Sequence, residues 1–249
     1  MGIITGLKNI QKHDEEEEAR RAQRANKVNW LVVPKNGKVE IIFLQELDES
    51  SERYSEKNGL GFLATEHQGQ GREHFFKRIL CTNDEEHGFE CWGCEKNRME
   101  YANAKEKGDY DGGWRQHQNF YINVLVRYVD PESGEKKEEV AVLQRRRSSK
   151  SFVDQIINDF AVEDGFISNR LFTLSRKGEG FDTVYTLSHR KEDAGVNVED
   201  YELFDLKSLI REVDYADQPA ALGVSVAPPR RDIQDSGSTD PEDDDDDWL

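Results

Sequence analysis

The sequence predicts a mainly β chain, organised as a small barrel or sandwich with few helices. Short runs rich in β-branched and aromatic residues recur between residues 30 and 188, and turn sequences such as PKNGK and DPESGEKK separate them. All three cysteines of the 249-residue chain fall within fourteen residues, which indicates one local site that holds them together. Both ends of the chain are strongly charged, and we expect them to lie outside the folded body.

Residues 1–28 are interpreted as an N-terminal arm that contains a solvated helix. Residues 8–27 have good helix formers without Gly or Pro, and their acidic residues precede the basic ones, an order that suits the helix dipole. The stretch has almost no apolar stripe, so a surface helix without a partner is the alternative interpretation.

The folded core is expected over residues 29–214. Two helices are predicted in it: residues 151–161 have apolar side chains near helical spacing, and residues 197–213 have acidic residues near the start and basic ones near the end. The predicted strands lie within residues 30–34, 37–47, 74–80, 119–129, 138–144, 170–176 and 181–188.

Residues 215–249 predict a disordered acidic tail, because their composition offers too little apolar surface for folding. Nine acidic residues and no basic one lie between Asp232 and Leu249, so this segment carries −9 of the formal net charge of −17 and the rest carries −8. Net charge governs solubility and non-specific association, so a locally basic groove elsewhere is compatible with it. The tail ends in Trp248-Leu249, an apolar tip that a purely solubilising tail does not need.

The cysteines are expected to be free thiols in a soluble protein of a reducing compartment. Three is an odd number, the chain is far longer than domains that need disulfides, and no secretory signal opens the sequence. The longest apolar runs are strand-sized, so no membrane span is predicted.

Cys81, Cys91 and Cys94 predict a metal site, and zinc is the natural metal because thiolates are soft ligands and structural zinc sites are tetrahedral. The Cys-x2-Cys spacing is its most specific element, since two sulfur atoms so spaced can reach one ion from a tight turn, here one that contains Gly93. Buried core cysteines beside an isolated surface turn are the alternative. The candidates for a fourth ligand are His67, His74 and His87.

No enzymatic signature is found. A closed site of three cysteines and one histidine leaves no position for water, so it would hold a loop together rather than catalyse. The short glycine turns GQGREH and GEGFDT match no phosphate-binding fingerprint, and Gly-x-Ser-x-Gly and His-Glu-x-x-His are absent from the sequence. We therefore expect a non-enzymatic protein.

Binding of single-stranded nucleic acid has better support, because aromatic and basic residues alternate along several predicted strands. Such proteins combine a basic groove with aromatic rings on which bases stack, each base contributing about 1–3 kcal/mol. Core packing is the alternative for any single aromatic residue. Arg145, Arg146 and Arg147 are adjacent and cannot all be buried or paired cheaply, so contact with phosphates is expected for them.

The pattern His-x13-Cys-x9-Cys-x2-Cys, formed by His67, Cys81, Cys91 and Cys94, resembles the zinc site of the helix-destabilising single-stranded DNA-binding proteins of T-even-type bacteriophages. The run HQGQGREHFFKRILC and the stretch NFYINVLVRYVDPESGEKKEEVAVLQ also resemble that family, which likewise ends in an acidic tail. The resemblance covers roughly residues 30 to 190 plus the tail.

The resemblance implies a five-stranded OB-fold barrel with an inserted zinc subdomain at about residues 62–108, one structural zinc ion, and a cleft for single-stranded DNA. It implies self-association along DNA through the N-terminal arm. Trp248 and Leu249 are similar to the tail tips with which other single-strand binders dock partner proteins. The full set of expected DNA contacts joins aromatic and basic residues: Tyr110, Trp114, Arg115, Phe120, Tyr121, Arg145, Arg146, Arg147, Lys150 and Arg176.

The function expected on these grounds is the coating of single-stranded DNA during phage replication, recombination and repair, in the cytoplasm of a bacterial host. Replisome and recombination proteins would bind the acidic tail. The alternative is a zinc-containing regulatory protein that binds RNA or a protein partner.

Overall fold

The computed structural model describes residues 28–71, 73–74, 76–107, 113–129, 134–148, 151–179 and 182–224. The predicted arm helix, the tail beyond Val224 and four predicted site residues lie outside the described residues. These four are Tyr110, Lys150, Trp248 and Leu249.

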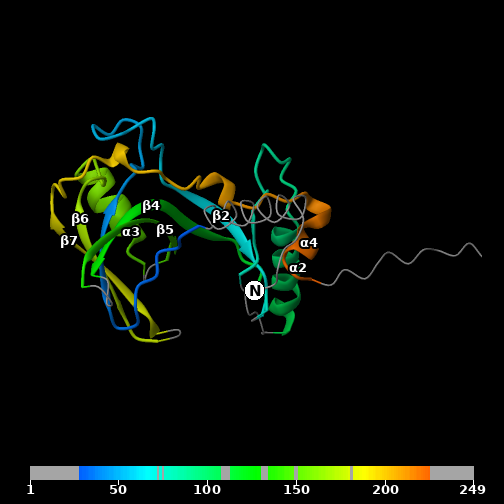
Figure 1. The fold of residues 1–249 in the computed structure, drawn as a ribbon. Coiled ribbons are helices and arrows are strands. Elements are labelled where there is room, and N and C mark those ends of the chain that lie inside the picture. Colours follow the sequence, from blue (N-terminus) through cyan, green and yellow to red (C-terminus); the bar gives the residue numbers. More distant parts are fainter. Residues whose placement is uncertain are drawn as a thin grey trace, which may run out of the picture.

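The fold is mainly β, as predicted, and consists of an antiparallel sheet of seven strands with few helices. The strand order is β3-β2-β4-β1-β6-β7, and β5 pairs with β4 outside this path (Figure 1). The strands are β1 (Lys38–Phe43), β2 (Phe62–Gln68), β3 (Arg78–Leu80), β4 (His117–Val129), β5 (Lys136–Arg146), β6 (Leu171–Lys177) and β7 (Val184–Lys191).

Strand β4 is the longest element of the sheet and connects its two ends. One edge of β4 pairs with β2 through residues 117–121 and with β1 through residues 124–127, while the other edge pairs with β5 over residues 119–129. Residues 119–126 are all buried, so both faces of this part of β4 are covered. Apart from Asn119 and Asn123 this run is apolar and aromatic, which suits a strand covered on both faces.

The sheet is not closed, whereas the resemblance implied a closed five-stranded barrel. Residues 29–31 lie along β5: Leu31 N donates to Val142 O at 2.9 Å and Val142 N donates to Asn29 O at 2.7 Å. The strand predicted at 30–34 is therefore a single bridge from Trp30 to Val142. Strands β5 and β7 do not pair with each other. The Arg145 guanidinium of β5 nevertheless lies 3.7 Å from the ring centroid of Tyr185 in β7, so a side-chain contact connects these two strands.

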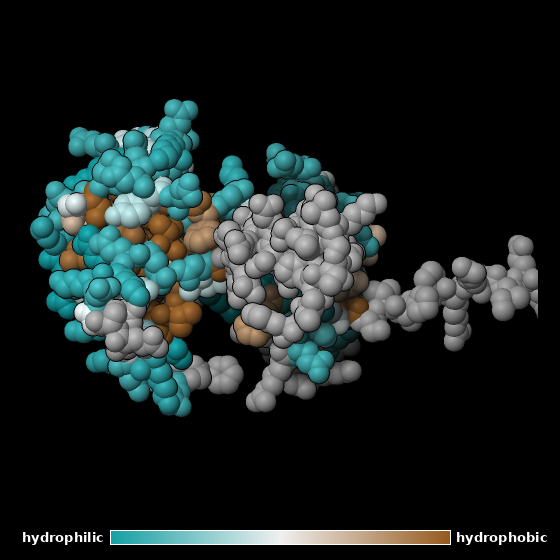
Figure 2. All heavy atoms as spheres, viewed as in Figure 1, coloured by the Kyte–Doolittle hydropathy of each residue, from teal (hydrophilic) through white to brown (hydrophobic). Residues whose placement is uncertain are grey.

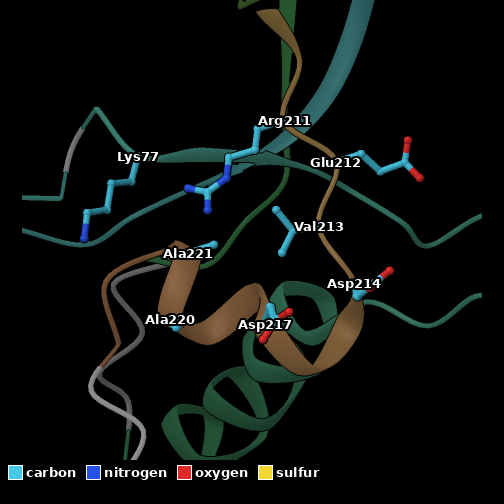
Figure 3. Close-up of a pocket in the computed structure, with 8 residues that line it drawn as sticks. All are labelled: Lys77, Arg211, Glu212, Val213, Asp214, Asp217, Ala220 and Ala221. Carbon is cyan, nitrogen blue, oxygen red and sulfur yellow. The ribbon is translucent and has the colours of Figure 1, made fainter. Parts of the chain in front are cut away.

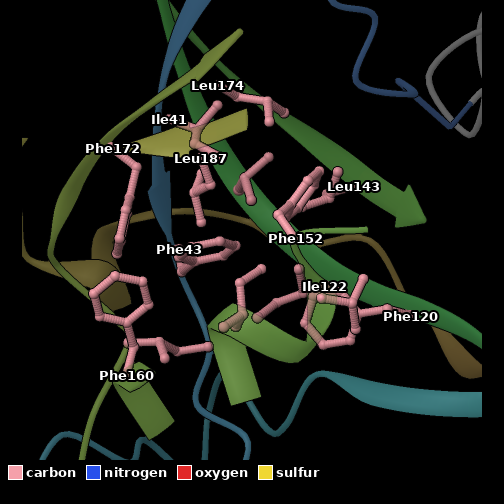
Figure 4. Close-up of a cluster of buried hydrophobic side chains, with 14 of the residues drawn as sticks. Ile41, Phe43, Phe120, Ile122, Leu143, Phe152, Phe160, Phe172, Leu174 and Leu187 are labelled. Atoms are coloured by element: carbon pink, nitrogen blue, oxygen red, sulfur yellow. The ribbon is translucent and has the colours of Figure 1, made fainter. Parts of the chain in front are cut away.

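The main hydrophobic core lies against the sheet and contains Phe43, Phe120, Phe160 and Phe172 (Figure 4). Phe172 meets Phe43 and Phe160 edge to face, with ring centroids 5.2 and 5.0 Å apart. Edge-to-face pairs contribute about 0.5–1.5 kcal/mol beyond burial of their area. On the surface shown in Figure 2, apolar residues appear between hydrophilic ones over the sheet.

The helix predicted at residues 151–161 is present, as α3 (Val153–Gln155) followed by the π-helix η1 (Ile156–Glu163). Ile156 and Phe160 point from it into the core. Its apolar spacing therefore gave a correct prediction.

The helix predicted at residues 197–213 is wrong. The segment is mostly extended, with short 3-10 turns at Val198–Asp200 and Lys207–Leu209. Asn123 fixes it to β4, because its side chain donates to Phe204 O at 3.0 Å and accepts from Phe204 N at 3.1 Å. An extended chain lets Leu203 join the cluster around Leu125 while Leu206 joins the cluster around Tyr121, which one helical stripe would not do.

Two further helices were not predicted. Helix α2 (Trp92–Lys107) begins directly after Cys91, and α4 (Gln218–Ala221) follows a 3-10 turn at Tyr215–Asp217. Figure 1 shows α2 and α4 together, apart from β6 and β7. No helix among the described residues is long and apolar enough to cross a membrane.

Residues 215–224, which were predicted to belong to the disordered tail, are folded. Gln218 and Leu222 are fully buried. The Gln218 side chain accepts from Trp92 N at 2.9 Å and donates to Thr82 Oγ1 at 2.9 Å, which fixes this segment to α2 and to the chain after β3. The composition of this segment predicted disorder because composition alone does not show which few residues, such as Gln218 and Leu222, become buried.

Candidate metal centre

The structure brings the predicted histidine and the three cysteines together. His67 lies in β2, Cys81 follows β3, Cys91 precedes α2, and Cys94 lies in the first turn of α2. Their four ligand atoms are within 4.8 Å of one another, and all but Cys94 are buried. The cluster can therefore hold one metal ion.

The sulfur atoms are arranged as separate ligands and not as a disulfide. Cys81 Sγ lies 3.9 Å from Cys91 Sγ and 3.5 Å from Cys94 Sγ, whereas a disulfide bond measures about 2.05 Å. His67 Nε2 lies 3.4 Å from Cys94 Sγ. All three thiols are free.

The orientation of His67 is set by the chain before β4. His67 is fully buried, and its Nδ1 lies 2.9 Å from Trp114 O. Because the carbonyl only accepts, Nδ1 carries a proton, which leaves Nε2 as the ring atom that can bind an ion once its own proton is displaced. Trp114 was expected to contact DNA; instead its buried ring packs edge to face on Trp92, and its Nε1 donates to Glu100 Oε1 at 3.0 Å.

The Cys-x2-Cys pair spans a helix start and not the tight turn expected from Gly93. Glu95 N donates to Cys91 O at 3.1 Å, as in a first helical turn. A Cβ atom at Gly93 would lie 2.5 Å from His67 Cγ. Glycine is required because the imidazole ring packs directly on this backbone.

The other candidate histidines lie elsewhere. The ring of His74 packs against the backbone of Gly223, outside the cluster. His87 is hydrogen-bonded to Asp84 Oδ1 at 2.6 Å and to Glu212 Oε1 at 3.1 Å, and these two carboxyl groups raise its pKa. His67 is thus the histidine that completes the cluster.

The cluster holds protons that a metal ion must displace. Burial lowers the pKa of His67, but interaction with the sulfur atoms of Cys81 and Cys91 outweighs burial and raises it to about 9. Hydrogen bonds from Cys81 and Cys94 lower the pKa of Cys91, whereas hydrogen bonds to Cys81 and Cys91, together with burial, raise the pKa of Cys94. Metal affinity must therefore fall as the pH falls.

A cavity of about 460 Å³, which we call the aromatic cavity, lies on the other side of β2 from the metal cluster. Trp30 and Phe76 are exposed at it, with 43 % and 85 % of their surface accessible. The lining residues are Trp30, Leu31, Glu66, Phe76, Arg78, Tyr121, Val142, Gln144 and Leu209.

Positive charge gathers next to this cavity. Arg146 Nη2 donates to His117 Nδ1 at 2.6 Å. Burial and then the charges of Arg146, His67, Arg115 and Arg78 lower the pKa of His117 to about 4. A neutral His117 thus accepts from a guanidinium within a cluster of arginines, an arrangement suited to binding an anion.

The aromatic residues predicted to contact DNA divide between core and cavity. Phe120 is 1 % exposed and packs in the main core, so it offers no ring face to a base. Tyr121 lines the aromatic cavity, although it is 2 % exposed. Phe120 and Tyr121 therefore lie on opposite faces of β4, with Phe120 in the main core and Tyr121 at the cavity.

The three adjacent arginines also divide. Arg145 lies over the Tyr185 ring, and Arg147 Nε donates to Asp154 Oδ1 at 2.6 Å. Arg146 is exposed beside His117. Only the middle arginine therefore lies in the basic cluster.

Of the remaining predicted contacts, Arg115 is exposed and near His117, whereas Arg176 is half-buried with its Nη1 3.4 Å from Val33 O. Sequence reasoning missed Trp30, Phe76, Arg78 and His117 as candidate contacts. The run HFFKR contained a signal, because it joins aromatic and basic residues directly before β3.

A second cavity, of about 580 Å³, lies between β3 and the α4 segment. Figure 3 shows Lys77 and Arg211 on one side of it and Asp214 and Asp217 on another. Its opposite charges give no preference for one sign of ligand.

Comparison with protein-family models, curated proteins and solved structures finds no match to this chain. Functional inference therefore depends on the residues and geometry described above.

Proposed function

We propose that the metal ion is zinc and that its role is structural. Zinc–sulfur bonds of about 2.3 Å and a zinc–nitrogen bond of about 2.0–2.1 Å, set tetrahedrally, require separations of roughly 3.8 Å between sulfurs and roughly 3.5 Å between sulfur and nitrogen. The separations from Cys81 Sγ are 3.9 and 3.5 Å, and that from His67 Nε2 to Cys94 Sγ is 3.4 Å. Three thiolates and one imidazole suit zinc and do not suit magnesium or calcium.

Four protein ligands fill a tetrahedral zinc site, so no position is left for a substrate. The ligands come from β2, from the chain after β3 and from the start of α2. An ion bound by all four ligands would hold these three segments in fixed positions relative to one another. The binding free energy of such a site is part of the folding free energy.

We propose that the protein binds single-stranded DNA. The observation that carries this proposal is the aromatic cavity, where exposed Trp30 and Phe76 lie with Arg78 beside the cluster around Arg146. Rings offer stacking surfaces to unpaired bases, and guanidinium groups neutralise phosphates. Duplex DNA presents no free base faces to such rings.

The resemblance to the phage helix-destabilising proteins extends this proposal to the coating of single strands during replication, recombination and repair. An OB-type core is part of the proposal, with residues 29–31 and the Arg145–Tyr185 contact completing the wall where strands do not pair. The N-terminal arm would mediate self-association, and the tail tip Trp248-Leu249 would recruit replisome and recombination proteins.

The test is a titration of the zinc-loaded full chain against poly-dT, duplex DNA and single-stranded RNA at two salt concentrations. We expect salt-sensitive binding to poly-dT that greatly exceeds binding to duplex. Equal affinity for duplex, preference for RNA, or no binding to single strands would overturn the proposal.

A further inference from the structure

The floor of the aromatic cavity is polar and buried. Tyr121 OH donates to Glu66 Oε2 at 2.8 Å, and Asn119 Nδ2 donates to the same oxygen at 2.6 Å. Gln144 Nε2 donates to Tyr121 OH at 3.1 Å. Glu66 is 2 % exposed and yet lines the cavity.

This network leaves one oxygen of Glu66 without a donor. Both donors reach Oε2, and among the described residues no hydrogen bond is formed to Oε1. Glu66 Oε1 does not belong to the fully enclosed polar atoms that lack a partner, so it retains some contact with solvent, and Glu66 lines the cavity. A ligand N–H that replaced water there would form a hydrogen bond to this oxygen. The floor therefore presents an acceptor to whatever enters the cavity.

The walls suit a flat aromatic ligand. Leu31, Val142 and Leu209 line the sides, and Trp30 and Phe76 supply ring faces. The volume of about 460 Å³ lies within the range of about 300–1,000 Å³ that is usual for small-ligand sites. Arg78 on the same wall can meet the phosphate attached to the ligand.

We infer that the aromatic cavity accepts a single unstacked nucleobase and prefers bases that carry an exocyclic amino group over thymine. The inference rests on the proposed binding of single-stranded DNA. The amino group of cytosine or adenine donates to a carboxyl acceptor, whereas thymine presents the carbonyl oxygen O4 at the equivalent position. Facing Glu66 Oε1, thymine would place two acceptors together.

The experiment compares oligo-dC with oligo-dT of equal length, using the zinc-loaded full chain at fixed salt and fluorescence anisotropy. These pyrimidines differ at the ring edge that meets Glu66, and both stack weakly on themselves. A single acceptor contact predicts roughly fivefold tighter binding of oligo-dC. Equal affinities, or tighter binding of oligo-dT, would overturn the inference and leave the single-strand function intact.

Variants assign the preference to Glu66. Glu66→Gln keeps an acceptor for Tyr121 and Asn119 but brings an NH2 group, so the preference for oligo-dC should disappear. Glu40→Gln, which changes an exposed carboxyl group on β1, is the matched control and should keep the preference. If Glu66→Gln also keeps it, Glu66 is not the acceptor and the inference fails.

Leu209→Trp provides a test that leaves the buried network untouched. The larger side chain fills the cavity from its wall, so discrimination should be lost while salt-dependent binding persists. Retained discrimination would place the base elsewhere and overturn the inference. Failure of the wild-type chain to bind any single strand would instead overturn the proposed function.

Discussion

Replacing Gly93 by Ala should weaken metal binding, although alanine favours helices. The new methyl group would lie 2.5 Å from His67 Cγ and 2.7 Å from two further ring atoms. The imidazole is fully buried and hydrogen-bonded to Trp114 O, so it cannot move aside freely. Overpacking of this kind costs about 1–3 kcal/mol. Since about 1.4 kcal/mol is tenfold, the zinc dissociation constant should rise roughly 5-fold to 150-fold.

The assay is competition for zinc between the protein and a chromogenic chelator at constant pH. Asn103→Ala, at an exposed position of the same helix, is the control for helix propensity and should leave zinc affinity unchanged. Glycine in a helix interior costs about 0.5–1 kcal/mol relative to alanine. If Gly93→Ala binds zinc as tightly as the wild type, the contact between this backbone and His67 is not what requires glycine.

Three predictions concern the basic and aromatic surface. Arg146→Ala should reduce the slope of log K against log salt for single-stranded DNA by about 0.7. Arg147→Ala, which loses an ion pair with Asp154, should leave the slope unchanged. Equal slopes in the two variants would contradict the assignment of Arg146 to phosphate contact. Trp30→Ala should weaken binding by about 1–3 kcal/mol at constant salt slope, measured by anisotropy, and unchanged affinity would exclude stacking there. Because the pKa of His117 is lowered to about 4 in the folded state, the unfolded state binds the extra proton first, so the free energy of unfolding should fall as the pH decreases from about 6.5 toward 4. Chemical denaturation of His117→Gln should show a smaller decrease over this window, and an identical decrease would show that His117 does not titrate in this way.

The cysteines of the metal centre could be predicted from sequence because the spacing of ligands along a short segment is a local property. Cys81, Cys91 and Cys94 lie within fourteen residues of one another, so their sulfur atoms can reach a common ion. The choice of His67 over two other histidines followed from the resemblance. The geometric reason, the pairing of His67 with Ile79 beside the first cysteine, is a property of the β2–β3 pairing, and β2 itself was not predicted.

The contacts of β4 could not be predicted in the same way. Alternation along a strand places Phe120 and Tyr121 on opposite faces, but which face is open depends on what covers the sheet. The helix η1 covers the first face, and the extended segment around Leu206 covers much of the second. Because that segment was expected to be a helix, its packing over Tyr121 was not predicted from the sequence.

The same strand β2 serves the metal cluster and the aromatic cavity. Its successive side chains point to opposite faces, so His67 reaches the sulfur atoms while Glu66 reaches the cavity floor. An ion bound to His67 therefore also fixes the position of Glu66 and of the Tyr121 hydroxyl that bonds to it.

Removal of zinc by a chelator should thus abolish discrimination between oligo-dC and oligo-dT before it abolishes binding. The basic cluster depends in part on Arg146 of β5, a strand that holds none of the four ligands, so phosphate contacts should outlast the base contact. Anisotropy titrations with both oligonucleotides during stepwise chelation, followed alongside by far-UV circular dichroism, measure the order of events. If discrimination persists in the metal-free protein, β2 holds its position without zinc, and the cavity and the metal centre act independently.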